Sequence, residues 1–309
     1  MARHGNRHPE MQGKVCVLSP QVSISKNFYW IIVPTARQAP ESRLFCDVRK
    51  TMIAGMLLLG CVTLKAQEKK KKLRELSPDR PHQTESPHTV DVGHIMFETD
   101  VVNTTFYHNT VPHSATTGLF YFNLKAGIQK NMDVEVLSNA LSFTRYEHQA
   151  LPPTHTAFPD LTFRYKLNVL GNDSGRTSIA IMPFVTTSNF FADKWQAKTG
   201  GLFVNAEHLF GEKYEIGYTG GLTSFSIRPF FQTYELFSTV SFSYPLYKSL
   251  DHFVEVSERF NRFSEVRNNY SIDSGFTFTP TRNNQFDMGF YYFIPIRQLY
   301  IFIGTTIRI

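Results

Sequence analysis

The feature that most constrains the fold is a strict two-residue alternation of apolar and polar side chains, which recurs from Gly93 to the end of the chain. The clearest stretch is 161–169, Leu-Thr-Phe-Arg-Tyr-Lys-Leu-Asn-Val, in which every second side chain is apolar. Successive side chains of a β-strand point to opposite faces. The pattern therefore predicts strands that have one apolar and one polar face.

Twelve stretches follow this pattern, and most are about ten residues long, which matches the length of a tilted membrane-spanning β-strand. They are 94–103, 117–129, 132–143, 159–169, 177–187, 200–210, 214–223, 230–244, 252–260, 268–279, 285–294 and 298–309.

The connections between these stretches alternate in length. Only Lys130 and Asn131 separate the second stretch from the third, and 211–213 and 280–284 are similarly short. The intervening connections are mostly longer: 104–116, 144–158, 188–199, 224–229 and 261–267. Short turns on the periplasmic side and long loops on the outer side are typical of outer-membrane barrels. Bacterial barrels that consist of a single chain have an even number of strands, as predicted here.

A soluble β-sandwich or a lipocalin-type barrel would also alternate, but it would bury its apolar face. Here the apolar face is rich in Phe, Tyr, Leu, Ile and Val over twelve strands, which is more than one small core can bury, whereas lipid can cover it. The sequence therefore predicts an all-β fold, a transmembrane antiparallel up-and-down β-barrel of about 12 strands over residues 93–309.

The region before the barrel has the features of an exported protein. Arg49 and Lys50 precede an apolar run, 52–64, and the small residue Ala66 follows it. This order predicts a signal peptide over 49–67. The run is too short for a transmembrane helix, which needs roughly 20 residues. Its end, Leu58–Cys61, also resembles a lipoprotein processing site, although the residues after Cys61 stay apolar.

The 48 residues before Arg49 leave two interpretations open. Either translation starts near Val48 or Met52, or the chain has a long leader. We treat 1–67 as a leader in both cases. Residues 68–92 contain a run of four lysines and three prolines, which predicts an extended periplasmic segment before the barrel.

The end of the chain also fits a barrel. Gly304, Ile307 and Ile309 resemble the assembly signal of outer-membrane barrels, in which a glycine precedes alternating large hydrophobic residues. The usual last residue is aromatic, so the match is partial.

Charge and cysteine both divide the chain at the leader. The formal net charge is +6, and residues 1–67, with nine Lys or Arg and three acids, contain all of the excess. A nucleic-acid-binding domain needs a basic surface, so that class is excluded for the barrel. Cys16, Cys46 and Cys61 all lie in the leader, which leaves the barrel without a thiol for a disulfide, a metal or a nucleophile.

Charged and aromatic side chains occupy the polar, inward face of the predicted strands. Isolated charges cannot be buried without compensation, so they line either a hydrated lumen or a closed lumen filled by salt bridges. The predicted lumen-lining residues are Glu98, Asp100, Tyr121, Lys125, Asp133, Glu135, Arg164, Lys166, Glu207, Glu215, Asp273 and Asp287.

The chain carries no motif of a known catalytic or cofactor site. There is no GxSxG, HExxH, P-loop or dinucleotide-binding glycine run. The histidines between His82 and His113 lack the spacing of a compact metal site. His208 falls on the lipid-facing side, where a residue at headgroup level needs no catalytic role. We therefore expect neither enzymatic activity nor a cofactor or metal.

Residues 79–94, Asp-Arg-Pro-His-Gln-Thr-Glu-Ser-Pro-His-Thr-Val-Asp-Val-Gly-His, resemble the opening of the outer-membrane transporters named for the meta pathway of phenol degradation. The resemblance continues more loosely over roughly 230 residues to the Gly304 ending. It implies uptake of aromatic compounds. The motif residues are Asp79, Arg80, Gln83, Thr84, Glu85 and Ser86, and we infer that they pin the N-terminal segment across or into the periplasmic mouth.

The sequence therefore predicts a channel or transporter for small solutes, aromatic or amphipathic ones included, in the outer membrane of a Gram-negative cell. The alternative is a closed-lumen structural or surface barrel without transport. The expected partners are outer-membrane lipid, the barrel-assembly machinery and a small solute, and nucleic acid is not among them.

Overall fold

The computed structural model describes residues 73–108, 113–146, 154–157, 160–188, 196–211, 213–228, 231–261 and 268–309. All of them belong to one compact unit of the chain, Ile53–Ile309. The leader, the predicted signal peptide at 49–67 and Cys61 lie outside the described residues.

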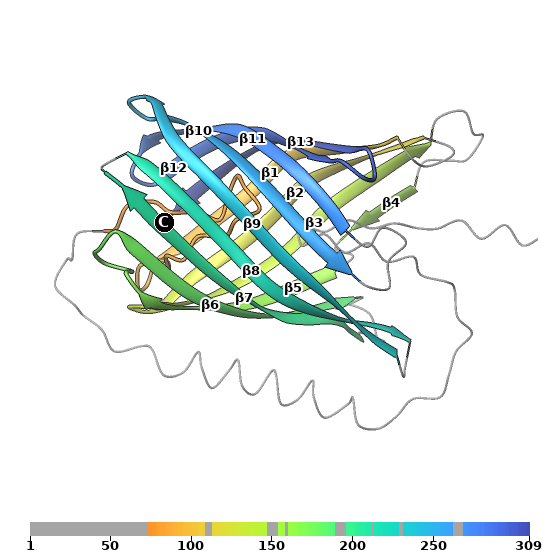
Figure 1. Cartoon of the computed structure of the whole chain (residues 1–309), viewed down its shortest axis with the longest axis horizontal. Coiled ribbons are helices and arrows are strands. Elements are labelled where there is room, and N and C mark those ends of the chain that lie inside the picture. The colour runs from red at the N-terminus through yellow and green to blue at the C-terminus, as the bar shows by residue number, and fades with distance from the viewer. Residues whose placement is uncertain are drawn as a thin grey trace, which may run out of the picture. The chain divides into compact units, whose positions relative to one another are not determined.

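The described chain is built from strands (Figure 1). They are β1 (Ile95–Tyr107), β2 (Ser114–Gln129), β3 (Met132–Tyr146), β4 (Thr154–Ala157), β5 (Asp160–Leu170), β6 (Thr177–Ser188), β7 (Gln196–Phe210), β8 (Tyr214–Arg228), β9 (Phe231–Tyr247), β10 (Leu250–Asn261), β11 (Asn268–Thr281), β12 (Asn284–Phe293) and β13 (Gln298–Arg308).

The sheet closes on itself because β1 pairs antiparallel with both β2 and β13. At the seam, the N–H of Ile309 donates to the carbonyl of Ile95 at 2.9 Å, and the N–H of Ile95 donates to the carbonyl of Ile309 at 2.8 Å. Over the described residues, the chain forms the predicted all-β fold, a closed twelve-stranded antiparallel barrel to which β4 is added. No described helix has the length and hydropathy needed to span a membrane.

The strand β4 was not predicted. It pairs with 141–144 of β3, whereas β5 pairs with 132–137 of the same strand. Residues 141–144 of β3 therefore have a different neighbouring strand from residues 132–137. β4 is four residues long, which is too short to show an alternation in the sequence.

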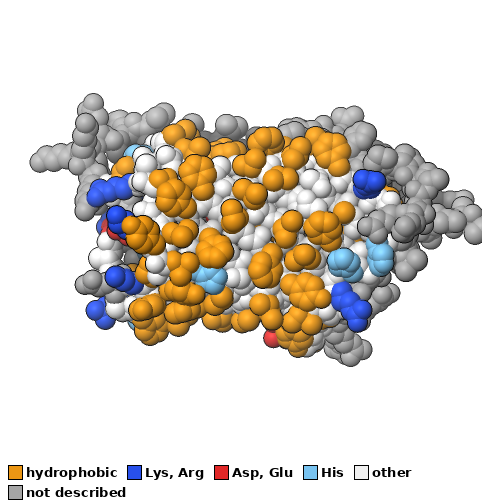
Figure 2. Space-filling model, turned by 90° about the horizontal axis from the view of Figure 1, so that it is seen from above, with side chains coloured by type: hydrophobic (Ala, Val, Ile, Leu, Met, Phe, Trp, Pro, Cys, Tyr) orange, Lys and Arg blue, Asp and Glu red, His pale blue; other side chains and the backbone are white. Residues whose placement is uncertain are grey.

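The two faces of the wall have the predicted chemistry. On β7, Leu202 and Val204 point outward and are 46% and 39% exposed, whereas the intervening Phe203 and the next inward residue, Asn205, are buried. Figure 2 shows hydrophobic side chains spread over the middle of the barrel wall, with Lys and Arg towards its two ends. This is the distribution of a lipid-covered barrel surface.

The described residues before β1 run into the barrel (Figure 1). We call residues 73–92 the plug. Its central part, from Asp79 to Val90, is largely buried against inward-facing side chains of strands on every side of the barrel. The described part of segment 68–92 is irregular chain that packs against the wall and fills part of the lumen.

Candidate functional site

Arg74 fixes the start of the plug, where the plug enters the barrel. Its guanidinium donates to the carbonyls of Thr89 and Lys130, both at 2.6 Å, and to Asp173 at 2.9 Å. Lys130 lies in the β2–β3 turn and Asp173 in the β5–β6 turn. Arg74 therefore ties the start of the plug to two of the short turns.

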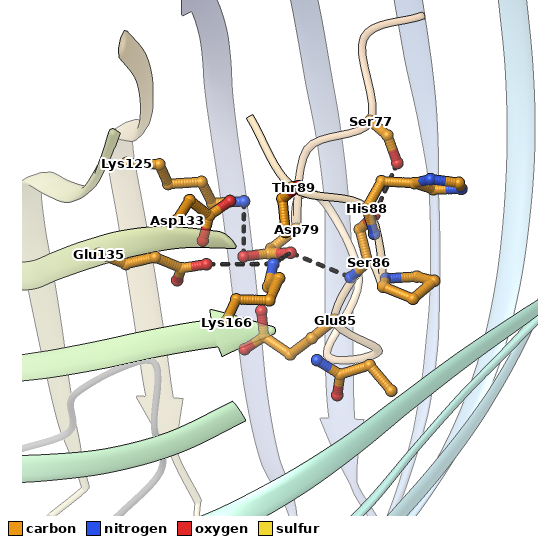
Figure 3. Close-up of polar contacts among 12 residues, drawn as sticks. Ser77, Asp79, Glu85, Ser86, His88, Thr89, Lys125, Asp133, Glu135 and Lys166 are labelled. Carbon is orange, nitrogen blue, oxygen red and sulfur yellow. Dashed lines mark hydrogen bonds and ion pairs between the residues drawn. The ribbon is translucent and has the colours of Figure 1, made fainter. Parts of the chain in front are cut away.

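Asp79 is the centre of a buried charge network (Figure 3). Its two carboxylate oxygens lie 2.6 Å from Nζ of Lys125 and 2.8 Å from Nζ of Lys166. Glu98 pairs with the same Lys125, and Glu135 with the same Lys166. Burial by itself would raise the pKa of Asp79, but the two ammonium groups outweigh it and hold this pKa well below its ordinary value.

Arg80 lies in a second network, which spans the seam between β1 and β13. Its guanidinium pairs with Asp100 of β1 and Asp287 of β12. It also lies over the ring of Phe302, 5.4 Å from the ring centroid. All four side chains are buried, so the contact takes place out of reach of bulk water.

Gln83 and Thr84 bond to acidic groups through their backbones. Their N–H groups donate to the two oxygens of Glu255, at 2.8 and 2.7 Å. The side-chain amide of Gln83 donates to Asp273 and to Ser271 of β11. Glu255 and Asp273 face each other across β10 and β11, so the plug supplies hydrogen-bond donors to two neighbouring carboxyl groups.

Glu85 and Ser86 complete the contacts of the motif. The carboxylate of Glu85 pairs with Nη1 of Arg164 at 2.9 Å, and its N–H donates to Thr219 at 2.8 Å. The N–H of Ser86 donates back to Asp79 at 3.0 Å. Burial raises the pKa of Glu85 to about 8, although the cation of Arg164 opposes the rise.

Aromatic rings fill part of the remaining lumen. Tyr291 stacks on Tyr300 with centroids 5.2 Å apart, and the hydroxyl of Tyr291 donates to the carbonyl of Pro81. Phe184 stacks on Phe203 at 4.7 Å, and Phe203 contacts Phe237 at 5.8 Å. The lumen therefore contains both charged side chains and apolar aromatic surface.

The structure places all twelve predicted lumen-lining residues on the inward face. Ten of them are buried, and Glu207 and Glu215, near the β7–β8 turn, are half-buried. Glu207 lies 3.3 Å from the ring of His88 in the plug. Whether these residues line a conducting lumen stays a prediction.

Sequence reasoning missed the small polar residues that contact the plug. They are Thr219, Thr239, Ser257 and Ser271. Their positions follow the same alternation as the charged residues, but an uncharged hydroxyl gives no signal of its own. The predicted assembly residues have separate surroundings: Ile307 and Ile309 are exposed, and Gly304 is buried beneath Arg80. Their assembly role stays a prediction.

No protein-family model and no curated protein matches this chain. Among solved structures, an outer-membrane channel from Pseudomonas putida F1 is 12% identical, with a TM-score of 0.52 over 72% of this chain and 97% of that one. The NanC porin is 7% identical, with a TM-score of 0.46 over 67% and 98%. The KdgM porin in complex with disordered oligogalacturonate is 7% identical, with a TM-score of 0.39 over 69% and 98%.

The first of these likenesses supports the fold of an outer-membrane β-barrel. At this identity it says nothing of the solute, and the resemblance to the phenol meta-pathway transporters stays an expectation. The expectation that the chain is not an enzyme also stays a prediction.

Proposed function

We propose that this protein is an outer-membrane channel for small solutes, that its own plug closes the lumen, and that it conducts when the plug leaves. Export through the signal at 49–67 and insertion by the barrel-assembly machinery would bring it to the outer membrane of a Gram-negative cell. The fold that it shares with an outer-membrane channel supports this assignment.

The observation that carries the proposal is the chemistry of the contact between plug and wall. A segment that only had to fill the barrel would do so best with apolar side chains, because buried ion pairs add little net stability. This plug is held instead by Asp79 and Arg80 through ion pairs, by the contact of Glu85 with Arg164, and by Gln83 and Thr84 through hydrogen bonds. Water can replace every one of these contacts, so the plug can separate from a wall that stays folded.

The solute class follows from the aromatic side chains that line the lumen around the plug. Buried aromatic residues share the inward face with the charged side chains: Tyr121, Tyr291, Tyr300 and Phe302. A path past them offers flat apolar faces together with polar groups. We therefore propose small amphipathic solutes, aromatic ones included, as the cargo.

A closed structural barrel is the second candidate. The observation in its favour is the density of the buried network, since Lys125, Lys166 and Arg164 each pair with a plug residue as well as a wall residue. Such a network can hold a barrel shut permanently. The two candidates differ in whether any current flows once the plug is released.

The test is conductance in planar lipid bilayers. The purified protein is compared with the double variant Asp79→Asn/Arg80→Ala, which removes both charged contacts at the start of the motif. We expect the variant to open far more often than the wild type and with a reproducible unit conductance. Glu258→Gln on the exposed outer face is the control and should behave as the wild type. If a variant that is folded by heat-modifiable gel mobility conducts no current, the closed-barrel candidate stands instead.

A further inference from the structure

The contact that holds Arg80 has the construction of a ligand site. Asp100 of β1, Asp287 of β12 and Phe302 of β13 surround its guanidinium, and we call these three residues the guanidinium clamp. Asp287 accepts from both Nε and Nη2, and Asp100 accepts from Nη1. Phe302 presents its ring to the same cation.

The strand register explains why this clamp fits a planar cation. Gly304 of β13 pairs with Asp100 on one side and with Asp287 on the other. Neighbouring strands lie about 4.8 Å apart, so the two carboxylates flank a gap over a residue without a side chain. A guanidinium has five N–H donors in a fixed fork and can bond to both carboxylates at once, whereas an ammonium group is a compact point charge.

The wall orients one carboxylate of the clamp, that of Asp100, through its own side chains. The hydroxyl of Tyr300 donates to Asp100 at 2.6 Å, and the side-chain amide of Asn103 donates to the same oxygen at 3.1 Å. Tyr300 is in turn stacked on Tyr291. The barrel therefore presents the carboxylate of Asp100 in one orientation through its own residues.

The charge of the clamp requires a cation. Its wall residues contribute two buried carboxylates, and the donors that Tyr300 and Asn103 add are uncharged. Arg80 contributes the positive charge. Buried carboxylates without compensation are costly, so a clamp that Arg80 has left favours another cation in its place.

We propose that the guanidinium clamp is a binding site for solutes that carry a guanidinium group, and that Arg80 occupies it as an internal mimic of that ligand. Such a solute competes with Arg80 for Asp100 and Asp287 and thereby favours release of the plug. The release of the plug rests on the proposed function, whereas binding to the clamp can be measured separately from it.

The test uses the full chain with Arg80→Ala, which empties the clamp, and methylguanidinium as the probe. Titration calorimetry of the folded variant in detergent should give one site. We expect methylguanidinium to bind at least about tenfold more tightly than methylammonium, because only the guanidinium forms the fork. Adding Asp287→Asn should weaken the binding by about tenfold or more, since a charge-assisted bidentate contact is lost. Adding Glu258→Gln on the outer face should leave it unchanged.

The same variant also gives a readout if it folds poorly. In that case methylguanidinium, and not methylammonium, should raise the yield of heat-modifiable barrel during refolding. Equal effects of the two cations, or binding that survives Asp287→Asn, would overturn the proposal.

Conductance measured in parallel separates this inference from the proposed function. If methylguanidinium binds to the Arg80→Ala protein but no plug variant conducts, the clamp is a ligand site and the proposed channel function is wrong. If plug variants conduct but methylguanidinium does not bind, the channel function is supported and the clamp proposal is wrong.

Discussion

Gly304 of β13 leaves open the space that the guanidinium of Arg80 occupies. A Cβ built on Gly304 would overlap Nη2 of Arg80, and it would also lie 2.5 Å from the carbonyl oxygen of Thr99 in β1. The glycine that the sequence suggested as part of an assembly signal is therefore also a packing requirement of the plug and of the closing seam.

Gly304→Ala should displace Arg80 and strain the β1–β13 seam. Overpacking of this kind typically costs 1–3 kcal/mol. We expect a lower unfolding temperature by heat-modifiable gel mobility, together with more frequent channel opening. Ile303→Leu changes the neighbouring residue, whose side chain is exposed on the outer face, and should affect neither property. An unchanged Gly304→Ala protein would show that Arg80 is not held where the structure places it.

Asp79→Asn should lower the stability of the protein more than a double variant that removes both members of one ion pair. The single variant leaves Lys125 and Lys166 beside a neutral amide in a buried site. Removing one partner of a buried pair typically costs about 3–5 kcal/mol. Asp79→Asn/Lys166→Gln removes two opposite charges and should recover part of that loss in urea unfolding of the reconstituted barrel. A double variant that is less stable than the single one would contradict the network drawn in Figure 3.

The closure of the barrel should be pH-dependent through Glu85. Its pKa is raised to about 8 in the docked plug, from an ordinary value of 4.5, because the carboxyl is buried. A raised pKa favours docking at low pH, and this contribution is lost as the pH rises through about 8. Channel opening should therefore increase between about pH 4.5 and pH 8 and level off above that range, and Glu85→Gln should flatten this increase. The opposite slope in the wild type, with no change in Glu85→Gln, would assign the pH response to other groups.

A charge on the outer face should destabilise the barrel according to its depth. Val204 of β7 is exposed towards lipid, and arginine near the membrane midplane costs roughly 2–4 kcal/mol. Tyr247, which lies beside the β9–β10 turn, should tolerate arginine at a cost of about 0–1 kcal/mol, as positions near the interface do. Urea unfolding in lipid vesicles measures both. Equal costs at the two positions would argue against a membrane-spanning wall.

The last strand should be essential for closure. Thr305–Arg308 pair with 96–99 of β1, and Ile309 exchanges two backbone hydrogen bonds with Ile95. Deletion of 305–309 exposes an unpaired edge, which cannot persist in hydrocarbon. We expect the truncated protein to be degraded before it reaches the outer membrane. A truncated species that is inserted and heat-modifiable would show that the seam closes without these residues.

The twelve strands of the barrel could be predicted because each of them carries its own signal. Arg164 and Lys166 alternate with Phe163 and Leu167, and the structure buries the two cations while the two apolar residues stay partly exposed on the outer face. The short strand β4 has no such signal, since it exists only through its pairing with β3.

The depth of the plug could not be predicted in the same way. Residues 79–86 have no periodicity, and their partners are far away in the sequence: Arg80 contacts Asp287, 207 positions further along the chain. The inward charges showed where compensation was needed. They did not show that Asp79, Arg80 and Glu85 would supply it, because that depends on how far the segment enters the barrel.

The proposed channel conducts only when the plug leaves the lumen, and a reversible cross-link tests this requirement. The hydroxyls of Thr84 in the plug and Thr239 in β9 are in contact, so Thr84→Cys/Thr239→Cys can join the plug to the wall. The pair is introduced into the Asp79→Asn protein with Cys16, Cys46 and Cys61 replaced by Ser, and each single-Cys protein serves as a control. We expect the oxidised protein to be silent in a planar bilayer and to conduct after a reductant is added. Equal conductance before and after reduction, with the cross-link verified by mass spectrometry, would contradict the account.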